Sequence, residues 1–119
     1  MPNIHLMHLD YQIFEATRRG EKILEVRLND EKRRKIKVGD IIQFERAGDG
    51  LTIQVFVAAV RMYENLADLV AHEDLSKAGG IYKDQKDWKT CLQKYYSQEK
   101  QNLYGVVVFE LSFSASVLR

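Results

Sequence analysis

The sequence predicts an α+β domain built on a small, strongly curved β-barrel of about five to six mixed strands with about three helices. Two neighbouring strand-like segments, Ile41–Arg46 and residues 51–63, are joined by a short Ala-Gly-Asp-Gly connection that is typical of a hairpin. Consecutive antiparallel strands of this kind fit poorly with a parallel, doubly wound sheet. Residues 104–113 are almost continuously apolar, which predicts a strand buried on both faces.

The first third of the chain alternates between strand and helix signals. Ile4–Leu9 is short and apolar, as expected of a strand, and Asp10 is positioned to cap a helix over residues 11–19 that ends at Gly20. Residues 22–28 form a charged strand. A polar, basic loop follows from Asn29 and ends at the Val38-Gly39-Asp40 turn.

The second half contains two further helix signals. Asn65 is placed to cap a short helix, and residues 76–86 are polar and glycine-containing, as expected of a mobile loop. Asp87 then begins a helix with apolar residues at positions i, i+3, i+4 and i+7: Trp88, Cys91, Leu92 and Tyr95. This periodicity predicts that Tyr95 belongs to the core and that Tyr96, displaced by about 100° around the helix, faces away from it.

Length and composition are those of one soluble domain over residues 1–119. No apolar run reaches the roughly 20 residues that a membrane helix needs, and the N-terminus lacks a signal-peptide pattern. Cys91 is the single cysteine, so no internal disulfide is expected, and its place in an apolar stripe predicts a packed thiol. We therefore expect a cytoplasmic protein without a membrane partner.

Charge is unevenly distributed although the net charge is only +1. Residues 18–37 contain nine basic and four acidic side chains, so this window carries +5 and the rest of the chain −4. Such a polarised chain can present a positive surface to a polyanion, and it can equally be a solvated loop that keeps the protein soluble.

The segment from Gly20 to Arg27 is the strongest candidate site. Alternation places Glu25 and Arg27 on one face of the charged strand and Leu24 and Val26 on the other. Lys22 can reach Glu25 only if it lies in the turn before regular pleating begins. Buried charges are costly unless they pair or face a wet cleft. The segment therefore predicts a polar cleft, and the alternative is a Glu25–Arg27 pair that fixes a sheet edge.

This segment reads Gly-x-Lys-x-x-Glu-x-Arg, which resembles the signature of the ASCH domains, relatives of the PUA fold. The similarity covers most of the chain. It includes a histidine-bearing first strand, Phe14, Asn29-Asp30 after the motif, the Val38-Gly39-Asp40 turn and the Tyr104-Gly105 entry into the last strand.

The resemblance implies a PUA-like barrel with a cleft between barrel and helices, and a role in RNA or nucleotide metabolism. Some members look like amidohydrolases that remove an acyl group from a modified cytidine, and others look like ribonucleases that act on single strands. The catalytic lysine of the amidohydrolase type carries over as Lys22, but a threonine of that type is replaced by Glu25. A carboxylate cannot do the work of a hydroxyl, so cytidine deacylation gains little support.

The residues themselves suggest how a ligand would be held. A charged Lys22 would bind a phosphate or a developing oxyanion, and a neutral one would act as base or nucleophile. Further candidate contacts are His8, Asn29, Lys32, Arg33, Arg34, Tyr96 as a stacking ring, and Ser97 through its hydroxyl. Tyr82 is a weaker candidate for a lid. The histidines show no ligand spacing with Cys91, so we expect neither a metal nor another cofactor.

Three functions remain open from the sequence. The leading one is an RNA- or nucleotide-binding ASCH domain. The second is a hydrolase of a modified nucleoside or single-stranded RNA, an amidohydrolase or ribonuclease with Lys22 and Glu25 as catalytic residues. The third is a non-catalytic structural domain in which Lys22, Glu25 and Arg27 form a closed network.

Overall fold

The computed structural model describes residues 1–113 of the chain. Its five strands are β1 (Ile4–Leu9), β2 (Leu24–Leu28), β3 (Ile41–Arg46), β4 (Thr52–Tyr63) and β5 (Val106–Ser112). Its helices are α1 (Tyr11–Arg18), α2 (Glu31–Arg34), α3 (Leu66–His72), α4 (Gln85–Gln93) and α5 (Gln98–Tyr104), with a 3₁₀ turn η1 (Leu75–Lys77).

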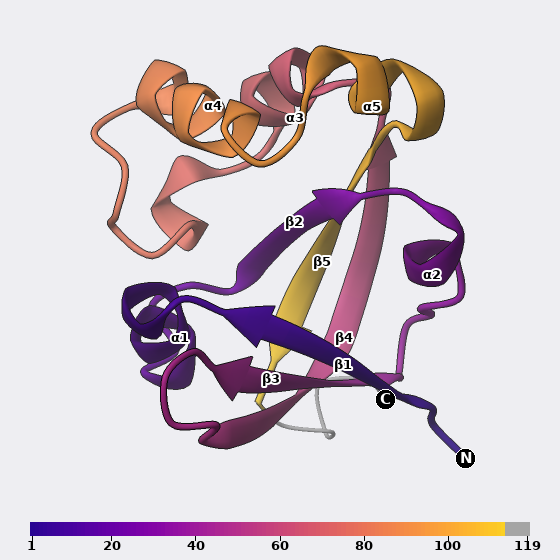
Figure 1. Cartoon of the computed structure of the whole chain (residues 1–119), viewed down its shortest axis with the longest axis vertical. Helices are drawn as coiled ribbons and strands as arrows, with labels where there is room; N and C mark the ends of the chain where they lie inside the picture. The colour runs from indigo at the N-terminus through magenta and orange to yellow at the C-terminus, as the bar shows by residue number, and fades with distance from the viewer. Residues whose placement is uncertain (114–119) are drawn as a thin grey trace.

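The strands form one mixed sheet in the order β1-β3-β4-β5-β2. β1 pairs with β3 in parallel, and the other three pairings are antiparallel. The sheet curls into a half-barrel, so its two edge strands, β1 and β2, approach each other across an open seam (Figure 1). This arrangement confirms the predicted α+β fold class.

Strands β4 and β5 run through the middle of the sheet and define its two faces. Residues Val106, Val107, Val108 and Phe109 are all fully buried, which confirms the prediction for this apolar segment. β4 is long enough to reach from the half-barrel to the helices at the far end, and its pairing with β5 shifts register near Val57.

Two apolar clusters occupy the two faces. The interior of the half-barrel contains Phe14, Ile42, Phe44, Val55, Val57, Val107 and Phe109 among others. The second cluster lies under the helices and contains Leu24, Val26, Leu66, Leu69, Trp88, Val106 and Val108. Strand β2 contributes Leu24 and Val26 to the second cluster, so the opposite side of this strand is left for Glu25 and Arg27.

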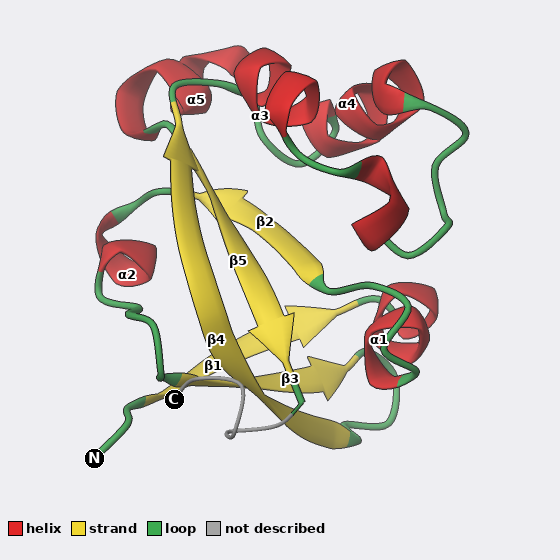
Figure 2. Ribbon diagram, turned by 180° about the vertical axis from the view of Figure 1, so that it is seen from behind, coloured by secondary structure: helices red, strands yellow, loops and turns green. Residues whose placement is uncertain are grey.

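Helices gather at opposite ends of the sheet. α3, α4 and α5 form a layer at one end, and α1 lies at the other end, next to the seam between β1 and β2 (Figures 1 and 2). Among the described residues, no helix is both long and apolar enough to cross a bilayer.

The structure differs from the sequence prediction at several boundaries. Asp30 accepts a hydrogen bond from the Arg33 amide and starts α2 within the segment that was predicted to be a loop. Ser97 caps α5 in the same way. Tyr104 therefore ends this helix, whereas the sequence predicted that it begins the last strand. Asp84, three residues earlier than predicted, caps α4.

Candidate functional site

Lys22 lies in the connection between α1 and β2, before regular pleating begins at Leu24. Gly20 turns the chain with a positive φ of 76°. Lys22 then forms an isolated antiparallel bridge with Ala78, outside the main sheet. This departure from strand alternation places the Lys22 side chain on the same side as Glu25. Lys22 thus lies in the turn before the regular strand, which is the position from which the sequence predicted that it can reach Glu25.

Lys22, Glu25 and Arg27, which we call the ion triad, form a continuous chain of hydrogen-bonded charges. Lys22 Nζ lies 2.6 Å from Glu25 Oε1, and Arg27 Nε lies 2.7 Å from Glu25 Oε2. The Lys22 and Glu25 side chains are only 8% and 5% exposed. The triad combines two cationic side chains with one carboxylate, so the excess positive charge favours an anionic ligand beside it.

The charges of the triad stabilise one another against the cost of burial. Burial by itself raises the pKa of Glu25, but the neighbouring Lys22 and Arg27 outweigh it, so the pKa lies below its usual value. Burial lowers the pKa of Arg27, and the Glu25 carboxylate reverses this and raises it. Glu25 is thus a carboxylate with both oxygens occupied by cations.

A cavity of about 190 Å³ opens beside the triad, between the half-barrel and the helical layer. All three triad side chains line this first cavity. An apolar cavity of about 150 Å³ is large enough for benzene, whereas drug-sized ligands need about 300 Å³ or more. The first cavity therefore suits one flat ring.

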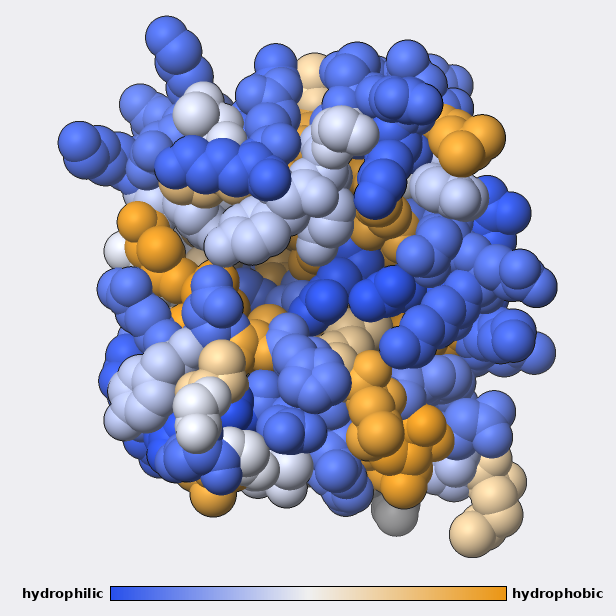
Figure 3. All heavy atoms as spheres, viewed as in Figure 1, coloured by the Kyte–Doolittle hydropathy of each residue, from blue (hydrophilic) through white to orange (hydrophobic). Residues whose placement is uncertain are grey.

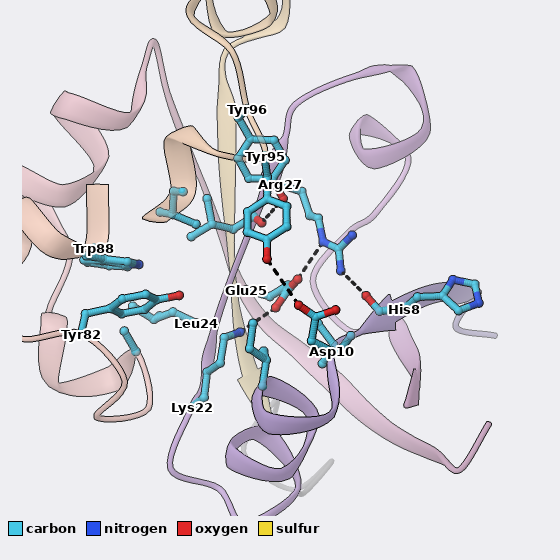
Figure 4. A pocket seen from close by; sticks show the side chains of 15 residues that line it. His8, Asp10, Lys22, Leu24, Glu25, Arg27, Tyr82, Trp88, Tyr95 and Tyr96 are labelled. Atoms are coloured by element: carbon cyan, nitrogen blue, oxygen red, sulfur yellow. Dashed lines mark hydrogen bonds and ion pairs between the residues drawn. The ribbon is translucent and has the colours of Figure 1, made fainter. Parts of the chain in front are cut away.

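Four aromatic residues from the helical side, Tyr82, Trp88, Tyr95 and Tyr96, also line the first cavity, and we call them the aromatic wall. Figure 4 shows Tyr82 and Trp88 facing the ion triad across this space. Their rings stack on each other with centroids 6.2 Å apart. Burial raises the pKa of Tyr82 to about 12, so its phenol is a neutral group. Among the described residues, its hydroxyl has no hydrogen-bond partner.

Tyr95 and Tyr96 have exchanged the environments that helical periodicity predicts. Tyr95 was expected in the core, but it is 63% exposed. Tyr96 is half-buried, and its hydroxyl donates to the Val26 carbonyl oxygen at 2.9 Å. The reason is that α4 ends at Gln93, so both tyrosines lie in the following turn, where a 100° spacing no longer holds.

Asp10 is a candidate site residue that the sequence reading missed. It precedes α1 as a cap should, yet its side chain makes no capping hydrogen bond. It accepts a hydrogen bond from the Tyr95 hydroxyl at 3.3 Å, across the mouth of the first cavity (Figure 4). An aspartate at this position is read as a helix cap by default, so the sequence held no signal for its second role.

Gly79 was also missed, because the segment around it was expected to be a mobile loop. The chain there forms the turn η1, and Ala78 is buried against Lys22. A Cβ atom on Gly79 would lie 2.8 Å from Lys22 Cβ, and the backbone has a φ of 97°. Only glycine fits both conditions, so this residue fixes one side of Lys22.

The remaining predicted site residues lie in different places. His8 lines the first cavity, but its ring points away from the triad and lies 3.4 Å from Glu45 (Figure 4). Only its carbonyl oxygen joins the site, by accepting from Arg27 Nη2 at 3.0 Å.

The basic residues of α2 and the serine do not reach the first cavity. Lys32 and Arg33 line another cavity, and Arg34 donates to the carbonyl oxygen of Asn29. The Ser97 hydroxyl is engaged in capping α5. In residues 1–113, no cluster of three or more His, Cys, Asp or Glu side chains is arranged to hold a metal. Cys91 is partly exposed and not fully packed.

Comparisons with known proteins agree on one family. The sequence model of the ASCH domain matches residues 7–114. A crystal structure of hypothetical protein PH0355 is 32% identical, with a TM-score of 0.81, and the match covers 92% of this chain and 97% of that one. The solution structure of protein PF0455 from Pyrococcus furiosus is 33% identical, with a TM-score of 0.72 and coverage of 92% and 96%.

A crystal structure of ASCH from Zymomonas mobilis shares the fold at 11% identity, with a TM-score of 0.66 and coverage of 92% of this chain and 67% of that one. No curated protein matches this chain.

Proposed function

The chain belongs to the ASCH domain family, and from this premise we propose that it binds RNA or a nucleotide by taking one nucleobase into the first cavity. The observation that carries the proposal is the pairing of the ion triad with the aromatic wall across a space the size of one ring. Aromatic side chains stack on any base, whereas charged and hydrogen-bonding groups orient it and hold its phosphate.

Each group has a role that its contacts support. Lys22 and Arg27 supply positive charge beside a carboxylate whose oxygens they already occupy, which leaves their remaining N–H groups for the ligand. Tyr82 offers a hydroxyl that no other residue of the described chain, 1–113, engages in a hydrogen bond. Asp10 offers an acceptor at the mouth of the cavity for an amino or imino N–H of the base.

Salt dependence tests this proposal with the wild-type protein. Phosphate contacts release counterions, so affinity for single-stranded RNA should fall steeply between about 50 and 200 mM salt. Fluorescence anisotropy of a labelled RNA across this range measures the effect. Affinity that does not change with salt contradicts a phosphate-binding role.

A pair of variants separates the first cavity from the general charge of the surface. Arg27→Ala removes a cavity cation, and Arg18→Ala removes an exposed arginine that pairs with Glu15 and does not line the cavity. Both lower the net charge equally. We expect a loss of about tenfold or more for Arg27→Ala, as for a charge-assisted contact, and little change for Arg18→Ala. Equal losses would place binding elsewhere.

Hydrolysis of a modified nucleoside or of single-stranded RNA is a second candidate, which the buried Lys22–Glu25 pair favours. A lysine in a 2.6 Å ion pair is placed to donate to a developing oxyanion and not to attack as a free amine. This hypothesis expects turnover by the wild type that Lys22→Met abolishes while the fold, followed by circular dichroism, stays intact. A panel of acylated nucleosides and RNA oligomers that stays unchanged by the wild type rules it out.

A further inference from the structure

A second cavity, of about 250 Å³, lies between β1 and α2. It is bounded by Ile4 and Leu6 on one side and by Lys32, Arg33 and Ile36 on the other. It does not share a lining residue with the first cavity. None of its lining residues belongs to the Gly20–Arg27 motif or to the ion triad.

The arginine of this cavity has an incomplete hydrogen-bond set. Arg33 Nη1 donates to Asp30 Oδ2 at 3.1 Å, but the Nε atom is buried without a partner among the described residues. A buried donor without a partner costs about 1–3 kcal/mol, and more for a charged group. Such a group is uncommon in native proteins, and binding of a water, an ion or a ligand near the guanidinium is one explanation for it.

The other walls supply a cation without an ion pair among the described residues and an apolar surface. Lys32 is exposed and forms no ion pair or hydrogen bond within residues 1–113. Ile4 and Leu6 are 54% and 58% exposed and lie on the same side of β1, so they form an apolar platform at the surface. Cations beside an apolar platform match an anion with a flat apolar body.

The two cavities are neighbours along one strand. Ile4, Leu6 and His8 alternate on the outward side of β1, and His8 lines the first cavity. Residues i and i+2 of a strand are about 6.6 Å apart, so Leu6 of the second cavity and His8 of the first are neighbours on β1. Figure 3 shows a hollow with hydrophilic atoms at its centre and an apolar patch beneath it. The positive charge of Arg33 also acts on the Tyr96 phenol, which belongs to the aromatic wall.

We infer that the second cavity is a subsite for the nucleotide next to the one in the first cavity, so that the ligand is an oligonucleotide strand and not a free mononucleotide. Lys32 and the guanidinium of Arg33 meet its phosphate, and its base lies on Ile4 and Leu6. Arg27 lines the first cavity and also donates to the His8 carbonyl oxygen on β1, two residues along the strand from Leu6. This inference rests on the proposed function and adds that the ligand spans at least two adjacent nucleotides.

The test compares a mixture of the four ribonucleoside monophosphates with a short mixed-sequence single-stranded RNA. The RNA is expected to bind at least about tenfold more tightly than the monophosphates. Lys32→Ala is expected to weaken RNA binding and to reduce the salt slope by about 1, with no effect on monophosphate binding. The matched control is Lys35→Ala, an exposed lysine of the same segment that lines neither cavity.

Arg33→Lys provides a second variant, because it keeps the charge but removes the planar guanidinium that can bind a phosphate through two N–H groups. We expect it to weaken RNA binding while Asp30 still caps α2 through the backbone amide. Circular dichroism and thermal unfolding confirm that the variant is folded.

Several results would overturn the subsite. These are RNA that binds no more tightly than the monophosphates, equal effects of Lys32→Ala and Lys35→Ala, or an acidic peptide that competes as well as RNA of equal charge. The first cavity is judged separately. If Arg27→Ala leaves both monophosphate and RNA binding unchanged, the proposed function itself fails.

Discussion

Arg27 Nη2 donates to the main-chain carbonyl oxygen of His8 at 3.0 Å, and this contact joins β2 to β1 across the open seam of the half-barrel. The same guanidinium holds Glu25 through Nε. One side chain therefore links the two edge strands and orients the ion triad, so changes at Arg27 should affect both the stability of the fold and the site.

Arg27→Lys should separate these two roles. A lysine keeps the charge but has no planar fork to contact Glu25 and the His8 carbonyl oxygen together. We expect the free energy of unfolding to fall by about 1–3 kcal/mol, the usual value for a lost hydrogen bond to a charged group. Denaturant titration measures this change. A variant as stable as the wild type would show that the seam does not depend on this contact.

Glu25→Gln should destabilise the protein more than a surface substitution, because it leaves Lys22 and Arg27 facing each other without their carboxylate. Removing one partner of a buried ion pair costs about 3–5 kcal/mol. Glu73→Gln is a matched control, since Glu73 is also buried and paired, with Arg61, but lies outside the first cavity. We expect both variants to lose stability and only Glu25→Gln to lose ligand affinity. Loss of affinity in both would point to a general effect of unfolding.

Acid should destabilise the wild type. Burial raises the pKa of Glu25, but Lys22 and Arg27 hold it below its ordinary value of 4.5, and the hydrogen bond from Arg61 lowers that of Glu73. A carboxyl with a lowered pKa stabilises the fold above its unfolded pKa and loses this contribution as pH falls through the folded value.

The free energy of unfolding should therefore decline as pH falls below about 4.5, and less steeply in Glu25→Gln. Chemical denaturation at a series of pH values measures both slopes. Identical slopes would mean that Glu25 has the same pKa in the folded and unfolded states.

Gly79→Ala should disturb the site through the backbone. The added Cβ would lie 2.8 Å from Lys22 Cβ, at a φ of 97°. Overpacking and a left-handed backbone conformation together cost about 2–5 kcal/mol. Gly80→Ala is the matched control, with a similar φ of 69° and nothing within 4 Å of the new atom. We expect only the strain of about 1–2 kcal/mol there. Equal losses of stability would show that the contact with Lys22 does not matter.

Tyr95 and Tyr96 should respond differently to substitution. Tyr95→Ala removes an exposed ring and should weaken nucleotide binding by about 1–3 kcal/mol with little change in stability. Tyr96→Phe keeps a ring in the aromatic wall and loses only the hydrogen bond to Val26, so it should cost about 1 kcal/mol of stability and leave affinity unchanged. Isothermal titration and thermal unfolding distinguish the two, and the reverse pattern would assign the stacking ring to Tyr96.

The curved mixed sheet, the buried last strand and the shared face of Glu25 and Arg27 could be predicted from the sequence, whereas the contact of Lys22 with Glu25 was predicted only on the condition of a turn after Gly20. The arrangement of charges between Gly20 and Arg27 is local, because strand alternation and a glycine turn fix the relation of residues a few positions apart. The short helices α2 and α5 were not predicted, since four to seven residues carry too little periodicity and such helices depend on their caps.

The groups that face the ion triad depend on how distant parts of the chain pack together. The contact between Asp10 and Tyr95 joins residues 85 positions apart, and the fit of Gly79 against Lys22 depends on how two loops pack. The first cavity arises in the same way, and so does the Arg33 Nε, which has no hydrogen-bond partner within residues 1–113. Such contacts follow from the docking of whole elements, which no spacing along the chain specifies.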